Sequence, residues 1–180
     1  VVDEAFMDVL HPVKEQSLIH VGQEFPNLVI LRSLTKFYSL PGLRFGYAIA
    51  HPQRLQKWQT WRDPWSVNSL AVAAAMAAVE DTKFQQQTLD WLPKARNELF
   101  AGLADIPGLQ PFKGAANFLL VESKGSTSDL QQKLLQYHQI LIRDCLSFPQ
   151  LGDRHFRVAV RLESENRRLV EAAREVGVGS

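Results

Sequence analysis

The sequence predicts an α/β protein with a strand-rich first part over residues 1–81 and a small α+β second part over residues 82–180. Two observations predict this class. In the first part, short apolar runs are bounded by Gly and Pro and separated by helical segments, which is typical of buried strands in a layered α/β fold. In the second part, the order becomes strand, helix, strand, strand, helix, which is typical of a compact α+β domain.

The first part contains strands, turns and short helices in a regular order. Its strands are expected at three apolar runs, residues 1–5, 28–32 and 44–50, with a short surface helix and loop over residues 11–27. Pro41 and Gly42 in the SLPG segment predict a type II turn. A helix is expected after Pro52, and Asn68 or Ser69 is expected to cap the Ala-rich helix that follows.

The second part begins with a long amphipathic helix, expected from about residue 82 to 103 and bent by Pro93. Three apolar segments then predict strands, namely ANFLLVES, ILIRDC and HFRVAVR. Two amphipathic segments predict helices, STSDLQQKLLQYH and SENRRLVEAAREV, and the Ser and Thr that open the first of them are typical of a helix cap.

The composition is that of an ordinary globular protein. Of its 180 residues, 46% are hydrophobic and 22% charged, with a net charge of +1, so nucleic acid and membrane surfaces are not expected as partners. A single cysteine excludes an internal disulfide and suggests a reducing, cytoplasmic location. The longest apolar helical run, residues 70–79, is too short to span a bilayer. Because VVDEAF already looks like a core strand, we expect the chain to be the C-terminal part of something longer.

Five residues of the first part form a chemically suggestive set: Asp3, Ser33, Thr35, Lys36 and Arg44. Asp3 belongs to one apolar strand and is expected to be buried, whereas Lys36 follows the next strand and is expected to be a desolvated, partly deprotonated amine. Ligands of open α/β sheets bind beyond such strand ends. The hydroxyls and the guanidinium suit a phosphate. A lysine, a phosphate site and an acid are the parts that hold pyridoxal phosphate, because the lysine forms the Schiff base and the acid keeps the pyridine nitrogen protonated. The alternative is an ordinary salt-bridged loop.

The segment SLTKFYSLPGLRFGY resembles the lysine motif of fold-type I pyridoxal-phosphate enzymes, in the aminotransferase group that includes histidinol-phosphate aminotransferase and threonine-phosphate decarboxylase. The resemblance implies that Lys36 is the catalytic Schiff-base lysine, that Ser33, Thr35 and Arg44 bind the cofactor phosphate, and that Asp3 in VVDEAF binds the pyridine nitrogen. It also implies that residues 1–81 are the C-terminal part of the large cofactor-binding domain, and residues 82–180 the small domain.

Three residues of the second part are candidates for substrate binding. GAANFLLV, ILIRDC and HFRVAVR resemble segments of the same family, which implies that Asn117, Arg143 and Arg157 face the substrate. Without the resemblance, a structural asparagine and surface arginines would be expected. Because Arg157 lies between Phe156 and Val158, the sequence also predicts a buried anion beside it.

Within this group of enzymes, the resemblance also implies one particular activity. Phe6 stands where many aminotransferases of this fold have Tyr, and DEAFMD, PWSVNSLA and FRVAVR together look most like threonine-phosphate decarboxylase. That enzyme converts L-threonine O-3-phosphate to aminopropanol phosphate in cobalamin synthesis. Histidinol-phosphate aminotransferase is the alternative, and such enzymes are usually homodimers.

A third, non-catalytic hypothesis follows from what the sequence lacks. Family members also use a Gly-rich phosphate turn, a stacking aromatic and an asparagine from an N-terminal half, and none of these is found here. A truncated chain unable to hold the cofactor would be a folding or association module.

Overall fold

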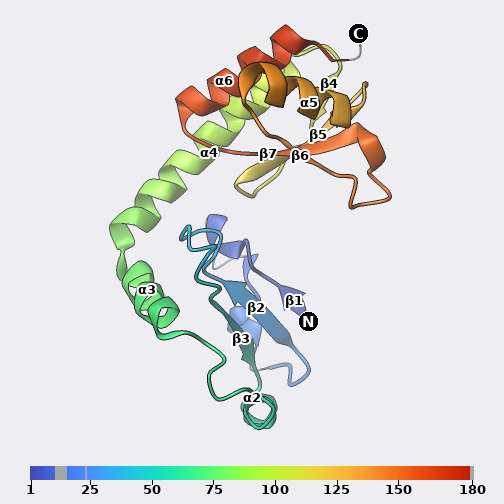
Figure 1. The fold of residues 1–180 in the computed structure, drawn as a ribbon. Coiled ribbons are helices and arrows are strands. Elements are labelled where there is room, and N and C mark those ends of the chain that lie inside the picture. The colour runs from blue at the N-terminus through green and yellow to red at the C-terminus, as the bar shows by residue number, and fades with distance from the viewer. Residues whose placement is uncertain (11–15, 23, 179–180) are drawn as a thin grey trace. The chain divides into compact units, whose positions relative to one another are not determined.

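The protein is described by a computed structural model that places residues 1–10, 16–22 and 24–178. Its described residues combine sheets and helices as the sequence predicts. The chain forms two compact units, residues 1–89 and 90–180 (Figure 1). The dividing point falls within helix α4 (Thr82–Ala104), and the domain boundary between residues 81 and 82 stays a prediction.

The described part of the first unit is built on a three-stranded sheet in the order β1-β2-β3 (Figure 1). Its strands are β1 (Val2–Asp3), β2 (Val29–Ser33) and β3 (Gly46–Ala50). β1 pairs with β2 in parallel, whereas β2 and β3 are antiparallel. The three predicted strands are therefore confirmed, but β1 is shorter than expected because the chain turns into the 3-10 helix η1 (Met7–Val9).

The described residues of this unit also form η2 (Ile19–Val21), α2 (Pro52–Gln59) and α3 (Ser69–Glu80). Asn68 caps α3 as predicted, because its side chain accepts a hydrogen bond from the Ala71 amide. Of the surface helix and loop predicted over residues 11–27, residues 11–15 and 23 lie outside the described residues. The core of the unit is formed by fully buried Ile30 together with Leu34, Phe37 and Ala71.

The predicted turn at SLPG is present over residues 41–43, but its expected type II geometry is wrong. A type II turn requires a left-handed backbone at its second central residue, and Gly42 is not among the residues with positive φ. Ser39, at φ +54°, and Arg44, at φ +56°, adopt that conformation instead. The chain therefore reverses over the whole segment between β2 and β3 rather than in one tight turn.

The described residues of the second unit form a four-stranded antiparallel sheet in the order β4-β5-β7-β6. Its strands are β4 (Leu109–Pro111), β5 (Phe118–Ser123), β6 (Arg143–Asp144) and β7 (His155–Ala159). The short η3 (Gly152–Arg154) leads into β7. Helices α5 (Thr127–His138) and α6 (Glu163–Val176) pack against each other on one side of this sheet (Figure 1).

Strand alternation gives this second sheet one buried face. Leu119 and Val121 of β5 and Phe156 and Val158 of β7 are all at least 95% buried. Since successive side chains point to opposite faces, the residues between them lie on the other face. β4 was not predicted, because it is three residues long and ends at Pro111. The predicted strand ILIRDC is reduced to two paired residues, and α4 continues through Pro93 to Ala104.

Candidate functional site

The predicted cofactor residues lie at one edge of the first sheet. Because β1 and β2 run in parallel, their carboxyl ends, at Asp3 and Ser33, lie at the same edge. β3 runs the other way and begins at that edge, where Gly46 is paired with Ser33. The segment between β2 and β3, which carries Thr35, Lys36 and Arg44, therefore begins and ends at that edge.

Lys36 lies against the segment that follows Asp3. Its ammonium nitrogen is 5.4 Å from the centre of the Phe6 ring, which is within the range of a cation–π contact. Lys36 is solvent-exposed, whereas the sequence predicts a desolvated amine. The exposure follows from its place in a turn beyond the end of β2. An exposed amine next to an aromatic ring is open to an incoming carbonyl compound.

Ser33 and Thr35 present a pair of hydroxyl groups beside the lysine. The two hydroxyl oxygens are 2.8 Å apart and hydrogen-bonded, and the Thr35 amide donates to the Ser33 hydroxyl at 3.2 Å. Thr35 is buried and Ser33 is half-buried. The turn is thus closed by its own side chains, and it offers two neighbouring hydroxyls of the kind that bind phosphate oxygens.

Arg44 is held in a left-handed backbone conformation just before β3. Its guanidinium is exposed and donates to the Pro41 carbonyl at 3.1 Å. Gly46 follows at a point of close strand approach, because a Cβ there would lie 2.9 Å from the Arg32 carbonyl oxygen. A side chain there would force the backbone to shift, so glycine fixes the start of β3, two residues after Arg44.

Asp3 is not buried, contrary to the prediction. It is exposed, and one carboxylate oxygen accepts a hydrogen bond from the Ala5 amide at 2.9 Å. The buried acid is its neighbour Glu4, which is only 1% exposed. Strand alternation accounts for the difference, because adjacent residues of β1 point to opposite faces of the sheet. Asp3 therefore reaches the sheet edge as an accessible carboxylate.

The sequence also missed the network that buries Glu4. Glu4 accepts hydrogen bonds from the Arg32 guanidinium at 2.9 Å and from the Ser17 hydroxyl at 2.8 Å. Arg32 also donates to Asp8 at 2.6 Å and to Ser17 at 3.0 Å. Burial raises the pKa of Asp8, against the opposing effect of Arg32. The signal in the sequence was an arginine inside the apolar run LVILRS. The network fixes the ends of β1 and β2, where Asp3 and Ser33 lie.

The predicted substrate arginines are brought together in the second unit. Arg143 of β6 and Arg157 of β7 are directly opposite each other across the strand pair. Both are exposed, and the Arg157 guanidinium lies 4.5 Å from the centre of the Phe118 ring. The predicted buried anion beside Arg157 is therefore wrong, since its side chain is on the open face while Phe156 and Val158 fill the core.

Asn117 directly precedes β5, on the strand next to β7. It is half-buried, and its carbonyl accepts a hydrogen bond from the Val160 amide at 2.9 Å. The loop before it is fixed by Arg96, which donates to the carbonyl of Ala115 at 2.6 Å. Asn117 is thus held at the start of β5, on the strand that pairs with the one carrying Arg157.

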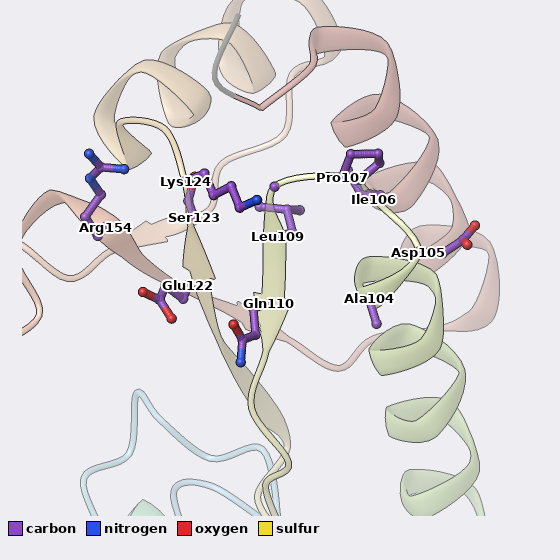
Figure 2. Close-up of a pocket in the computed structure, with 11 residues that line it drawn as sticks. Ala104, Asp105, Ile106, Pro107, Leu109, Gln110, Glu122, Ser123, Lys124 and Arg154 are labelled. Carbon is purple, nitrogen blue, oxygen red and sulfur yellow. The ribbon is translucent and has the colours of Figure 1, made fainter.

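A separate cavity of about 650 Å³ lies between the end of α4 and β4 in the second unit (Figure 2). It contains none of the predicted site residues. Its charged lining residues do not converge, because Asp105 and Arg154 point away from the others in Figure 2, and Asp105 is paired with Arg174. The cavity has no arrangement that selects one charge or one ligand.

Curated relatives match nearly the whole chain. It is 38% identical over 180 residues to a threonine-phosphate decarboxylase from Salmonella typhimurium, covering 99% of this chain and 49% of that protein. It is also 38% identical over 179 residues to a histidinol-phosphate aminotransferase from Nitratidesulfovibrio vulgaris, covering 98% of this chain and 46% of that one. The chain thus spans about half the length of these curated relatives.

The fold of this chain is also similar to solved structures of histidinol-phosphate aminotransferases. A histidinol-phosphate aminotransferase from Clostridium acetobutylicum superposes with a TM-score of 0.89 and 31% identity, covering 97% of this chain and 52% of that one. One from Sinorhizobium meliloti, in complex with pyridoxal-5'-phosphate, gives a TM-score of 0.84 and 28% identity, covering 97% and 47%. These matches confirm the predicted fold class, the C-terminal part of the fold-type I large domain plus the small domain.

The family model itself covers almost the entire sequence. The model for aminotransferase class I and II matches residues 1–172, which include every residue assigned above to the cofactor or the substrate. Enzymes of this family depend on pyridoxal phosphate. In the part of the chain that the structure describes, no helix has the length and apolar character needed to cross a membrane. The chain belongs to the class I and II aminotransferase family.

Proposed function

We propose that the protein binds pyridoxal 5'-phosphate through Lys36 and decarboxylates L-threonine O-3-phosphate to aminopropanol phosphate, an activity of cobalamin synthesis. The observation that carries the cofactor assignment is the gathering of an exposed lysine, a hydroxyl pair and an arginine at one sheet edge. We also propose a cytoplasmic homodimer, as the family resemblance implies.

The donor set at this edge fits the cofactor. Ser33, Thr35 and Arg44 would hold its phosphate, because hydroxyls and a guanidinium are the donors that phosphate oxygens prefer. The Lys36 amine would take its aldehyde, and the exposed Asp3 carboxylate would keep its ring nitrogen protonated. When bound, pyridoxal phosphate withdraws electrons from the substrate Cα, so that one bond to that carbon can break.

The substrate assignment rests on the second unit. L-Threonine O-3-phosphate carries a carboxylate and a phosphate on a short chain, and each anion suits one guanidinium. Arg143 and Arg157 are adjacent and exposed on the open sheet face, which supports their binding one small dianionic substrate. Asn117, which directly precedes β5, would donate or accept one further hydrogen bond.

The outcome at Cα depends on how the arginines orient the substrate. If they presented the carboxylate as the group to be lost, the substrate would release CO2. If the Cα–H bond were presented to Lys36 instead, its amine would take that proton and amino transfer would follow. Phe6 favours assignment of the protein as a decarboxylase, because it lacks the hydroxyl that many aminotransferases of this fold have at this position. The equally similar relative from N. vulgaris supports histidinol-phosphate aminotransferase as the second candidate.

One experiment separates the two activities. The purified protein is incubated with pyridoxal phosphate and either O-phospho-L-threonine or glutamate plus imidazole-acetol phosphate, and CO2 release and amino transfer are measured. We expect CO2 from the first substrate and little transfer in the second reaction. Transfer without CO2 would replace the decarboxylase with the aminotransferase.

A second experiment tests the cofactor site alone. We expect the protein to give the visible absorbance of a lysine-bound pyridoxal phosphate, and Lys36→Ala to lose it. Lys57→Ala is the matched control, since Lys57 is another exposed lysine in contact with an aromatic ring. A protein that shows no such band would support the non-catalytic module in place of an enzyme.

A further inference from the structure

Asn68 connects two segments that are 25 residues apart in sequence. Its side-chain oxygen accepts a hydrogen bond from the Ala71 amide at 2.7 Å and so caps α3. Its side-chain nitrogen donates to the Leu43 carbonyl at 3.2 Å. Because the oxygen must face an N–H group, the nitrogen is the atom that faces Leu43. One amide therefore holds both the first turn of a helix and the loop that carries Arg44.

The loop that receives this bond is also held by the Arg44 bond to the Pro41 carbonyl, and by the Leu34 amide, which donates to the Phe45 carbonyl at 3.2 Å. Pro41, Gly42 and Arg44 are exposed, and a Cβ added at Gly42 would meet nothing within 4 Å. Arg44 nevertheless holds a left-handed backbone, which is unfavourable for a residue with a side chain. Such a conformation persists when neighbouring contacts impose it. The Asn68 amide fixes the carbonyl of the residue immediately before Arg44.

We propose that Asn68 is a positioning residue for Arg44. By holding the Leu43 carbonyl, it keeps the Arg44 backbone in its left-handed conformation and its guanidinium at the sheet edge. The proposal deepens the cofactor assignment and rests on it for the role of Arg44 in phosphate binding. Asn68 itself touches neither cofactor nor substrate in this proposal.

The two bonds of Asn68 can be separated by substitution. Asn68→Asp keeps an oxygen that accepts from Ala71 and adds a favourable charge at the start of α3, but it has no N–H group for Leu43. Asn68→Ser also keeps the cap and loses the donor. Asn68→Ala loses both. A residue that only capped the helix would be replaced well by Asp and Ser, whereas a positioning residue would not.

The first measurement uses the protein without cofactor. Trypsin cleaves after arginine, so the rate of cleavage between Arg44 and Phe45 reports how often this loop opens. We expect Asn68→Asp and Asn68→Ser to be cleaved there about fivefold faster than the unaltered protein, the effect of losing one ordinary hydrogen bond. Their thermal midpoints should stay close to that of the unaltered protein, while Asn68→Ala should lower it. Equal cleavage rates for Asn68→Asp and the unaltered protein would overturn the proposal.

The second measurement compares pyridoxal phosphate with pyridoxal, which lacks the phosphate. We expect Asn68→Asp to weaken binding of the first about fivefold and to leave binding of the second unchanged. Equal loss of both ligands, or no loss of either, would overturn the link to phosphate binding. An unaltered protein that shows no phosphate preference would instead refute the cofactor assignment, and the cleavage rates would still decide whether Asn68 restrains the loop.

Discussion

Arg32 and Arg157 have similar surroundings in sequence but opposite surroundings in the fold. Each lies in an apolar strand, in LVILRS and in HFRVAVR. Arg32 is 5% exposed and is bonded to Glu4 and Asp8, whereas Arg157 is exposed and lies over the Phe118 ring. The face of the strand decides the difference, because Arg32 points the same way as buried Ile30, and Arg157 the opposite way to buried Phe156.

An arginine on the buried face of a strand must be paired with anions, whereas one on the exposed face need not be. A buried guanidinium needs anions, and Glu4 and Asp8 are supplied from 28 and 24 residues away. An exposed guanidinium needs no anion to be stable, so it is free to bind one from solution. Arg32 therefore supports the site from within the fold, and Arg157 is available to a substrate.

The largest effect on stability is expected when Arg32, the buried arginine, is replaced. Arg32→Met leaves the Glu4 carboxylate buried without its cation, so we expect the free energy of unfolding to fall by about 3–5 kcal/mol. Denaturant titration of the full chain measures it. Arg157→Met is the matched control with the same change of side chain. A loss below about 1 kcal/mol in Arg32→Met would mean that the network contributes little.

The second test addresses the close strand pairing beside Arg32. In Gly46→Ala the new Cβ would lie 2.9 Å from the Arg32 carbonyl oxygen, and backbone must move to relieve the contact. We expect a loss of about 1–3 kcal/mol in the free energy of unfolding. Gly42→Ala is the control, since nothing lies within 4 Å of its Cβ and its φ is not positive. Equal effects of the two substitutions would refute this explanation.

The third test uses pH and an acid of the second unit. Hydrogen bonds from Ser126 and Ser128 hold the pKa of Asp153 well below its ordinary value of 3.8. A lowered pKa in the folded state stabilises the protein above pH 3.8, and this stabilisation is lost as the pH falls below that value. We therefore expect stability to fall more steeply on acidification in the unaltered protein than in Asp153→Asn. Parallel curves of unfolding free energy against pH would contradict this.

The smallest effect on stability is expected when Arg157, the exposed arginine, is replaced. Arg157→Met removes a surface cation–π contact and also relieves the repulsion from Arg143, so we expect the free energy of unfolding to change by less than about 0.5 kcal/mol. Binding of O-phospho-L-threonine should weaken markedly in the same variant, as measured by calorimetry on the cofactor-loaded protein. Unchanged affinity would remove Arg157 from the proposed substrate site.

Local patterns in the sequence predicted much of the secondary structure. The caps at Asn68 and Ser126 were found because a short polar side chain before an amphipathic run is a local signal. β4 was missed because three residues ending in proline carry too little pattern. The turn at Gly42 was misassigned because the loop is shaped by a contact from Asn68, which is distant in sequence.

The candidate cofactor residues lie at one sheet edge, but the burial of Asp3 and Lys36 differs from the prediction. Parallel pairing of β1 and β2 places Asp3 at the sheet edge with Ser33, as the strand-end argument requires. Which of two adjacent acids is buried depends on the strand register, and a one-residue difference exchanges Asp3 and Glu4. Register is set by pairing with distant strands, so the Glu4–Arg32–Asp8 network could not be read from local sequence.

The direct opposition of Arg143 and Arg157 has a consequence for how the second unit responds to salt and ligand. Two like charges across a strand pair destabilise it slightly, and a bridging anion converts that repulsion into attraction. Sulfate or inorganic phosphate should therefore raise the melting temperature of the protein more than chloride at equal ionic strength. β6 would then be held loosely against β7 while no anion is bound, and tightly once one bridges the two arginines.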